Sequence, residues 1–295
     1  MRTNPFKGYG VALVTPFLEN GDVDYAALSR LVDFQIDNGA DFICAMGTTA
    51  ETPTLDEDEY QQVLRTIVKC VDGRVPIMAG CSDNCTARLV RRLQNNCFDG
   101  VSAVLSCVPS YNKPSQNGVY QHFMAVAEAS PLPIVLYNVP GRTGIDMLPE
   151  TTLSLARDSQ KFIAIKEASG NVAHIRQLIS EAPSGFEVIS GDDSLTFELM
   201  QYGAVGVISV IGNAIPQTFS RLVHNISSGD IAAARSIQEK LSSLYGLLFK
   251  EGNPCGIKAL MSERGLLMNS MRLPMTAVSA ELEGKIRDGF KSIGV

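Results

Sequence analysis

The chain has 295 residues, of which 45% are hydrophobic and 19% charged, the composition of a folded globular protein. Its formal net charge of -6 argues against a nucleic-acid partner. No apolar stretch reaches the length of a membrane span, and the N-terminal residues lack a signal-peptide core, so we expect no membrane association. Seven irregularly spaced cysteines without a C-x-x-C pair predict a reduced cytoplasmic protein with no metal site.

Short apolar runs of strand character alternate with segments of helical periodicity. One helix is predicted from Tyr25 to Asn38, between an Asp24 N-cap and a Gly39 C-cap, and another runs from Asp56 to Val71. Eight such units predict an α/β fold of the (β/α)8 TIM-barrel type. A doubly wound open sheet is the alternative, but the glycine-rich nucleotide fingerprint is missing after the first run. The eight runs lie at residues 11–14, 42–46, 75–79, 101–105, 134–137, 162–166, 186–190 and 205–210.

After Gly229 the pattern contains helices only, predicted at residues 230–249, 255–267 and 275–293. We therefore expect a barrel over residues 1–229 and a C-terminal three-helix extension over residues 230–295. No Pro/Gly/Ser-rich linker separates the two parts, which predicts that the extension packs on the barrel.

A lysine, Lys166, ends the sixth apolar run, Phe162 to Lys166. Burial disfavours the charged form of a lysine, and a neutral amine can form a Schiff base with a ketone or aldehyde. Lysines are mostly exposed, however, so Lys166 could simply reach into solvent.

Other polar residues follow the same ends of neighbouring runs, where TIM barrels build their active sites. Thr48 and Thr49 could hold a carboxylate with their hydroxyls and backbone amides, or could belong to an ordinary loop. Tyr137 could move protons or be a core aromatic residue. Arg142 could bind a carboxylate or be a surface charge, and the aspartates after Gly191 could merely cap a helix. The histidines lie in helical stretches and receive no catalytic role.

Taken together, these residues form a motif set that resembles the dihydrodipicolinate synthase family, within the N-acetylneuraminate lyase superfamily. The likeness extends over nearly the whole chain, from Gly10 to Thr276. The motifs that carry it are Gly47-Thr48-Thr49-x-Glu51, Tyr111-Asn112-Lys113-Pro114, Tyr137-Asn138-Val139-Pro140-x-Arg142-Thr143-Gly144, Ile165-Lys166-Glu167-Ala168 and Ser190-Gly191-Asp192-Asp193.

The resemblance implies an enzyme that condenses pyruvate with aspartate 4-semialdehyde for lysine and diaminopimelate biosynthesis. Lys166 would form the pyruvate imine without a metal or organic cofactor. Thr48, Tyr137 and Tyr111 would relay protons, with Tyr111 reaching into a neighbouring subunit of a homotetramer. The remaining implied roles are carboxylate binding by Thr49 and Arg142, and lining of the site by Gly191, Asp192 and the backbone carbonyl of Ile208.

The chain departs from the family pattern at several positions. Ala50 replaces a usual glycine, which costs roughly 1 kcal/mol if that position has a positive φ and is otherwise harmless. Ser110, Arg88 and Tyr60 differ from the residues at the inhibitor site of lysine-regulated members, which predicts weak or absent inhibition by lysine.

Two other functions compete with this one. A sugar-acid lyase on the same scaffold would share Lys166 and Tyr137 but generally lacks the arginine at position 142. A catalytically dead paralogue serving as a scaffold would be free to lose these residues, yet the chain keeps them.

Overall fold

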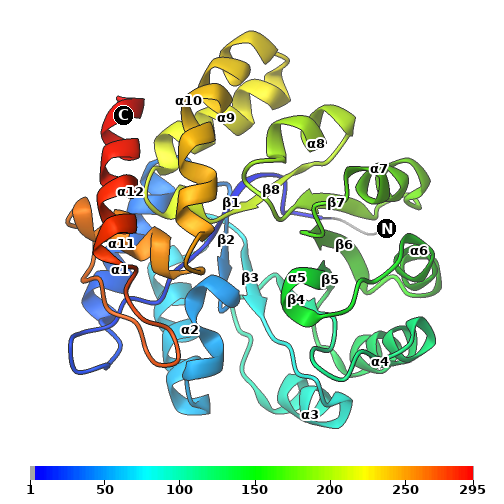
Figure 1. The fold of residues 1–295 in the computed structure, drawn as a ribbon. Helices are drawn as coiled ribbons and strands as arrows, with labels where there is room; N and C mark the ends of the chain where they lie inside the picture. Colours follow the sequence, from blue (N-terminus) through cyan, green and yellow to red (C-terminus); the bar gives the residue numbers. More distant parts are fainter. Residues whose placement is uncertain (1–3, 295) are drawn as a thin grey trace.

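The computed structural model describes residues 4–294 and confirms the expected TIM barrel, in which eight parallel strands close into a ring in sequence order (Figure 1). Tyr9 of the first strand pairs with Val207 of the last, which closes the ring. Each strand is buried on both faces, and this explains why the strands appear in the sequence as continuous apolar runs. The strands are β1 (Gly8–Ala12), β2 (Phe42–Ala45), β3 (Ile77–Gly80), β4 (Ala103–Cys107), β5 (Ile134–Asn138), β6 (Phe162–Glu167), β7 (Glu187–Ser190) and β8 (Gly206–Ser209).

Helices surround the barrel, and local hydrogen bonds fix where several of them begin. The Asp24 side chain caps the first helix by accepting from Ala27 N, and Asp56 and Glu59 form a capping box on the second. The helices that follow strands are α1 (Tyr25–Asp37), α2 (Glu57–Val71), α3 (Thr86–Asn95), α4 (Gln116–Ala129), α5 (Pro140–Thr143), α6 (Pro149–Asp158), α7 (Val172–Glu181), α8 (Thr196–Tyr202) and α9 (Pro216–Ser228), with short 3₁₀ turns η1 (Thr48–Ala50), η2 (Thr52–Thr54) and η3 (Ile211–Asn213).

Three helices end the chain, as predicted: α10 (Ile231–Phe249), α11 (Cys255–Glu263) and α12 (Ala280–Ile293). They lie together beside β1 and β8 in Figure 1, and α10 packs against α8 and α9. Gly229, at φ +85°, ends α9, and the Asp230 side chain caps α10. The boundary between barrel and extension after residue 229 stays a prediction.

The structure corrects some predicted ends. The first strand starts at Gly8 rather than Val11, and α11 stops at Glu263 rather than Leu267, just before Gly265 at φ +68°. The last helix starts at Ala280 instead of Met275, because the Ser279 hydroxyl caps it by accepting from Leu282 N.

None of the helices within residues 4–294 has the length and apolarity that a membrane crossing needs.

Candidate active site

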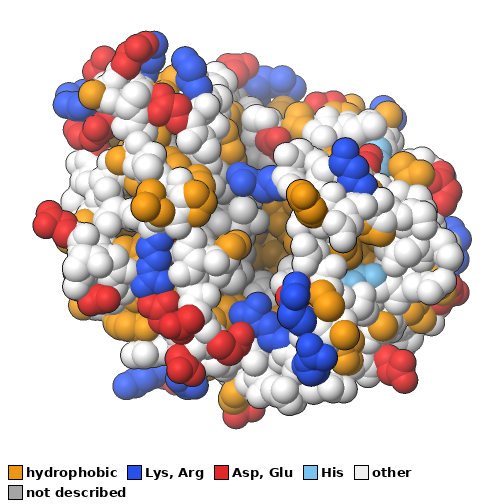
Figure 2. All heavy atoms as spheres, turned by 60° about the horizontal axis from the view of Figure 1, so that its bottom comes forward, with side chains coloured by type: hydrophobic (Ala, Val, Ile, Leu, Met, Phe, Trp, Pro, Cys, Tyr) orange, Lys and Arg blue, Asp and Glu red, His pale blue; other side chains and the backbone are white. Residues whose placement is uncertain are grey.

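A cavity of about 820 Å³ lies at the carboxyl ends of the barrel strands. Figure 2 shows that the molecular surface is hollowed near the middle of one face, with Lys and Arg side chains close to the hollow. The cavity brings together residues of the barrel loops and of α10. Its walls are formed by Thr48, Thr49, Tyr137, Val139, Gly141, Arg142, Lys166, Ala168, Gly191, Asp192, Asp193, Ser194, Val210, Gln238, Ser242, Tyr245, Gly246, Phe249 and Asn253.

Lys166 lies in this cavity with only 6% of its surface exposed, so it does not extend into bulk solvent. Its Nζ is 4.5 Å from the centre of the Tyr137 ring, and the two residues are cross-strand partners on β5 and β6. Within residues 4–294, no carboxylate forms an ion pair with Lys166. A secluded lysine without a counter-ion is unusual, and its amine is free to react with a carbonyl compound.

Gly191 leaves room for this lysine. A Cβ at residue 191 would lie 2.8 Å from Ala168 Cβ and 3.2 Å from Lys166 Cε. A side chain at this position would therefore press on the lysine stem, which gives a physical reason for glycine at the end of β7.

Thr48 and Thr49 form the tight turn η1 after β2, and both line the cavity. Non-glycine residues with positive φ bracket this turn: Met46 at 55° and Glu51 at 54°. Such conformations cost about 1–2 kcal/mol each and concentrate at functional sites. Ala50 does not have a positive φ, so the harmless alternative for this substitution is the correct one.

A contact between the C-terminal extension and this turn was not predicted from the sequence. Asn253, before α11, donates from Nδ2 to the Thr49 hydroxyl oxygen at 3.0 Å. Because that oxygen accepts from Asn253, the Thr49 hydroxyl proton can point elsewhere, including toward a bound anion. The Asn253 side chain is 5% exposed and also lines the cavity.

Arg142 lies on the short helix α5 and lines the cavity. No carboxylate within residues 4–294 pairs with its guanidinium. An exposed arginine without a partner at the rim of a cavity can bind a carboxylate through two parallel hydrogen bonds.

The two aspartates after Gly191 have different local roles. Asp192 Oδ1 accepts from Ser194 N and Leu195 N, as expected for a turn that leads into α8. The buried Asp193 accepts from Val210 N and Ile211 N, and burial raises its pKa to about 6. Ile208, in β8, is 1% exposed and does not line the cavity, so its expected role stays a prediction.

Tyr111 is not brought into the cavity of its own chain. Its side chain is 86% exposed, and its backbone has a φ of 77°. The Tyr111 N–H donates to the carbonyl of Thr143 at the end of α5, so the loop itself is held next to the arginine helix.

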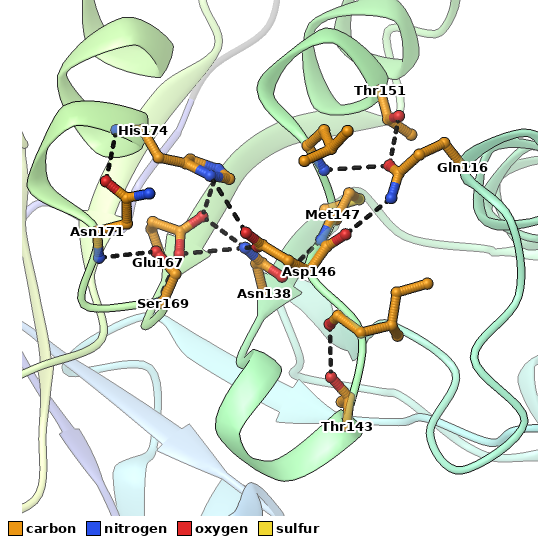
Figure 3. Close-up of polar contacts among 12 residues, drawn as sticks. Gln116, Asn138, Thr143, Asp146, Met147, Thr151, Glu167, Ser169, Asn171 and His174 are labelled. Carbon is orange, nitrogen blue, oxygen red and sulfur yellow. Dashed lines mark hydrogen bonds and ion pairs between the residues drawn. The ribbon is translucent and has the colours of Figure 1, made fainter.

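Behind the lysine lies a buried polar network that the sequence interpretation missed (Figure 3). Glu167 is fully buried, and burial raises its pKa to about 7, although hydrogen bonds from Ser169 and Asn138 oppose the rise. His174, which received no catalytic role, lies next to it, with Nε2 3.5 Å from Glu167 Oε2. Burial lowers the pKa of His174, and the nearby carboxylate of Asp146 opposes that shift.

A TIM barrel whose cavity holds an unpaired lysine, with a tyrosine and two threonine hydroxyls around it, is typical of lysine-dependent lyases. Residues 5–293 match the Dihydrodipicolinate synthetase family. A 4-hydroxy-tetrahydrodipicolinate synthase from Phocaeicola vulgatus is 54% identical over 281 residues, 95% of either chain. Another from Parabacteroides distasonis is 50% identical, covering 98% of this chain and 97% of its own.

A solved structure of the same family also matches this chain. The chloride inhibited dihydrodipicolinate synthase from Acinetobacter baumannii, complexed with pyruvate, superposes with a TM-score of 0.94 at 38% identity. The match covers 98% of this chain and 99% of that one. The chain belongs to the dihydrodipicolinate synthetase family. The expected activity, that of a 4-hydroxy-tetrahydrodipicolinate synthase and thus a lyase, is confirmed by these relatives.

Proposed function

We propose that Lys166 carries out this activity by forming an imine with pyruvate and condensing it with L-aspartate 4-semialdehyde. The observation that carries the proposal is the unpaired, 6% exposed lysine in the cavity beside Tyr137. The pyruvate complex of the Acinetobacter baumannii relative supports pyruvate as the first substrate.

The proposed reaction passes through an imine and an enamine and ends with ring closure. The Lys166 amine adds to the keto carbon of pyruvate and water leaves, which gives an imine that withdraws electrons from the methyl group. Loss of a methyl proton gives an enamine, whose carbon attacks the aldehyde carbon of the second substrate. The amine of that substrate then replaces Lys166 at the imine carbon, which closes the ring and frees the enzyme.

Thr48, Tyr137 and Tyr111 would move the protons in these steps. Tyr137 is 8% exposed beside the lysine, and Thr48 shares the cavity wall with it. A proton relay helps because the reaction takes up and releases protons in a site with limited access to water. No metal or organic cofactor is required by this sequence of steps.

The substrate carboxylates would bind at two places. Thr48 and Thr49 would hold the carboxylate of pyruvate, and Arg142, at the rim, would hold that of aspartate 4-semialdehyde. Gly191, Asp192 and the Ile208 carbonyl would complete the walls. We assign the barrel to residues 1–229 and treat residues 230–295 as the extension that closes one side of the cavity.

Tyr111 would act in trans. Its exposed side chain and strained backbone are consistent with a residue that reaches into the site of a second copy. We therefore propose a homotetramer built from two dimers. Tyr111→Phe should lower kcat while sedimentation velocity shows an unchanged assembly; an unchanged kcat would contradict this role.

The decisive experiment traps the imine. The purified protein is treated with pyruvate and borohydride, and the modified residue is identified by peptide mass spectrometry. Turnover of pyruvate plus aspartate 4-semialdehyde is measured in parallel, coupled to dihydrodipicolinate reductase. We expect modification of Lys166 alone, and loss of both trapping and turnover in Lys166→Ala.

Lys161→Ala is the matched control, because Lys161 lies just before the other end of β6 and donates to Ser130 O, away from the cavity. It should trap pyruvate and turn over normally. Trapping without turnover would exclude this second substrate and favour a sugar-acid lyase. Absence of trapping in the unaltered protein would refute the imine mechanism.

A further inference from the structure

The residues directly after Tyr137 and Lys166 form a second pair behind the first. Asn138 and Glu167 are cross-strand partners, as Tyr137 and Lys166 are, and successive side chains of a strand point to opposite faces. Asn138 Nδ2 donates to Glu167 Oε2 at 3.1 Å and Oε1 at 3.3 Å, and both residues are fully buried. Because the Tyr137–Lys166 pair faces the cavity, the Asn138–Glu167 pair faces the outer helices.

Asn138 also joins the two ends of the segment that carries Arg142. Its Oδ1 accepts from Met147 N at 3.0 Å, and its Nδ2 donates to Asp146 Oδ1 at 2.6 Å (Figure 3). Residues 138–147 thus form a ring closed by one side chain, with α5 in its middle. Because α5 has only four residues, contacts outside it help to hold Arg142 in place, and this closure is one of them.

Contacts from outside hold the same ring. Gln116 of α4 donates from Nε2 to Asp146 O at 2.8 Å. On the other side, Ser169 N donates to Glu167 Oε1 at 2.7 Å, so the carboxylate that receives Asn138 is itself fixed to β6 and its following loop. His174 closes the arrangement, with Nδ1 3.6 Å from Asp146 Oδ2 and Nε2 3.5 Å from Glu167 Oε2.

We propose that Asn138, Asp146 and Glu167 are positioning residues that fix Arg142 relative to Lys166 and thereby set the affinity for the second, carboxylate-bearing substrate. This inference rests on the proposed function, since it takes Arg142 as the group that binds that carboxylate. None of the three residues lines the cavity. Loss of their hydrogen bonds should leave pyruvate binding intact.

Asp146 offers the cleanest test because its side chain is 36% exposed, so truncating it leaves no large cavity in the core. Asp146→Ala removes one acceptor of Asn138 Nδ2 and leaves Glu167 as the other, whereas Asp146→Asn keeps an oxygen at residue 146. We expect Asp146→Ala to raise KM for aspartate 4-semialdehyde roughly tenfold, the effect of losing one hydrogen bond to a charged group. KM for pyruvate should change less than about twofold, and Asp146→Asn should restore both.

Asp158→Ala is the matched control. Asp158 ends α6, at the opposite end of that helix from the ring, and accepts one hydrogen bond from the Tyr120 hydroxyl at 2.7 Å. It should leave both KM values unchanged. Circular dichroism and a thermal melt of each variant establish that the fold is kept.

The outcomes separate this inference from the function on which it rests. If unaltered protein fails to trap pyruvate with borohydride, the proposed function itself is refuted. If Asp146→Ala traps pyruvate and turns over with an unchanged KM for the aldehyde, only the positioning role is refuted. An equal loss for both substrates, or failure of Asp146→Asn to restore the aldehyde KM, also overturns it.

Discussion

A buried ion pair connects the C-terminal extension to the threonine turn and gives the sharpest prediction. Lys258 of α11 is fully buried, and its Nζ lies 2.5 Å from Glu51 Oε1 and 2.9 Å from Ser270 O. Glu51 directly follows the turn and accepts from Arg272 N with its other oxygen. Burial lowers the pKa of Lys258, and the Glu51 carboxylate opposes that shift.

Lys258→Met keeps an unbranched apolar side chain but removes the charged Nζ, which lies 4.4 Å from the centre of the Phe17 ring. Glu51 would then be buried with a single backbone donor. Breaking a buried pair in this way costs about 3–5 kcal/mol of unfolding free energy, since one charge is left uncompensated. Replacing both partners, as in Glu51→Gln with Lys258→Met, should recover most of that loss.

The assay is urea denaturation followed by circular dichroism at one fixed protein concentration, applied to the unaltered protein, to Lys258→Met and to the double variant. Lys258→Met should unfold at the lowest urea concentration. The midpoint of the double variant should lie between that of Lys258→Met and that of the unaltered protein. A single-variant loss below about 1 kcal/mol, or a double variant less stable than the single one, would refute the reasoning about the uncompensated charge.

Further predictions concern binding, pH and regulation. Asn253→Ala should raise KM for pyruvate about fivefold, because one neutral hydrogen bond to Thr49 is lost; an unchanged KM would contradict the contact's role. Burial lowers the pKa of His122 to about 4, below its unfolded value near 6.5, so at this residue the unfolded chain binds more protons at pH 5 and the contribution of His122 to stability falls as pH drops. The buried Glu167 and Asp193, whose pKa values are raised, act in the opposite direction, so the test is a difference between proteins: going from pH 7.5 to pH 5 should lower the unfolding free energy of the unaltered protein by about 2 kcal/mol relative to His122→Gln. Lysine should inhibit weakly or not at all, given Arg88 and Tyr60, and saturation at micromolar lysine would refute this.

The architecture and the central lysine could be predicted because their signals are local. Strands buried on both faces appear as unbroken apolar runs, and their alternation with helices leaves few possible folds. Lys166 stands out because it ends such a run. The Asp24 cap was visible for the same reason, since it acts on a backbone group three residues away. Asp56, predicted as the first residue of its helix, is instead the N-cap of α2.

The contacts that surround the site could not be predicted, because they join residues far apart in the sequence. Asn253 meets Thr49 across 204 positions, and Lys258 meets Glu51 across 207. Nothing in the local pattern of a C-terminal helix shows which barrel loop it will contact. His174 was passed over because it lies in a helix, and only the fold brings that helix against Glu167.

The buried pair of Asn138 and Glu167 also helps to fix the alignment of β5 with β6. β5 and β6 pair in one register, with an irregularity between Ile134 and Val135. A slip by one residue would exchange the faces of Lys166 and Glu167, since side chains alternate along a strand. The slipped strand would turn a carboxylate toward the cavity and remove Glu167 as an acceptor of Asn138 Nδ2, which would keep only Asp146; the donor left unpaired costs about 1–3 kcal/mol. The same hydrogen bonds that hold the arginine segment therefore favour the one alignment in which the lysine faces the cavity.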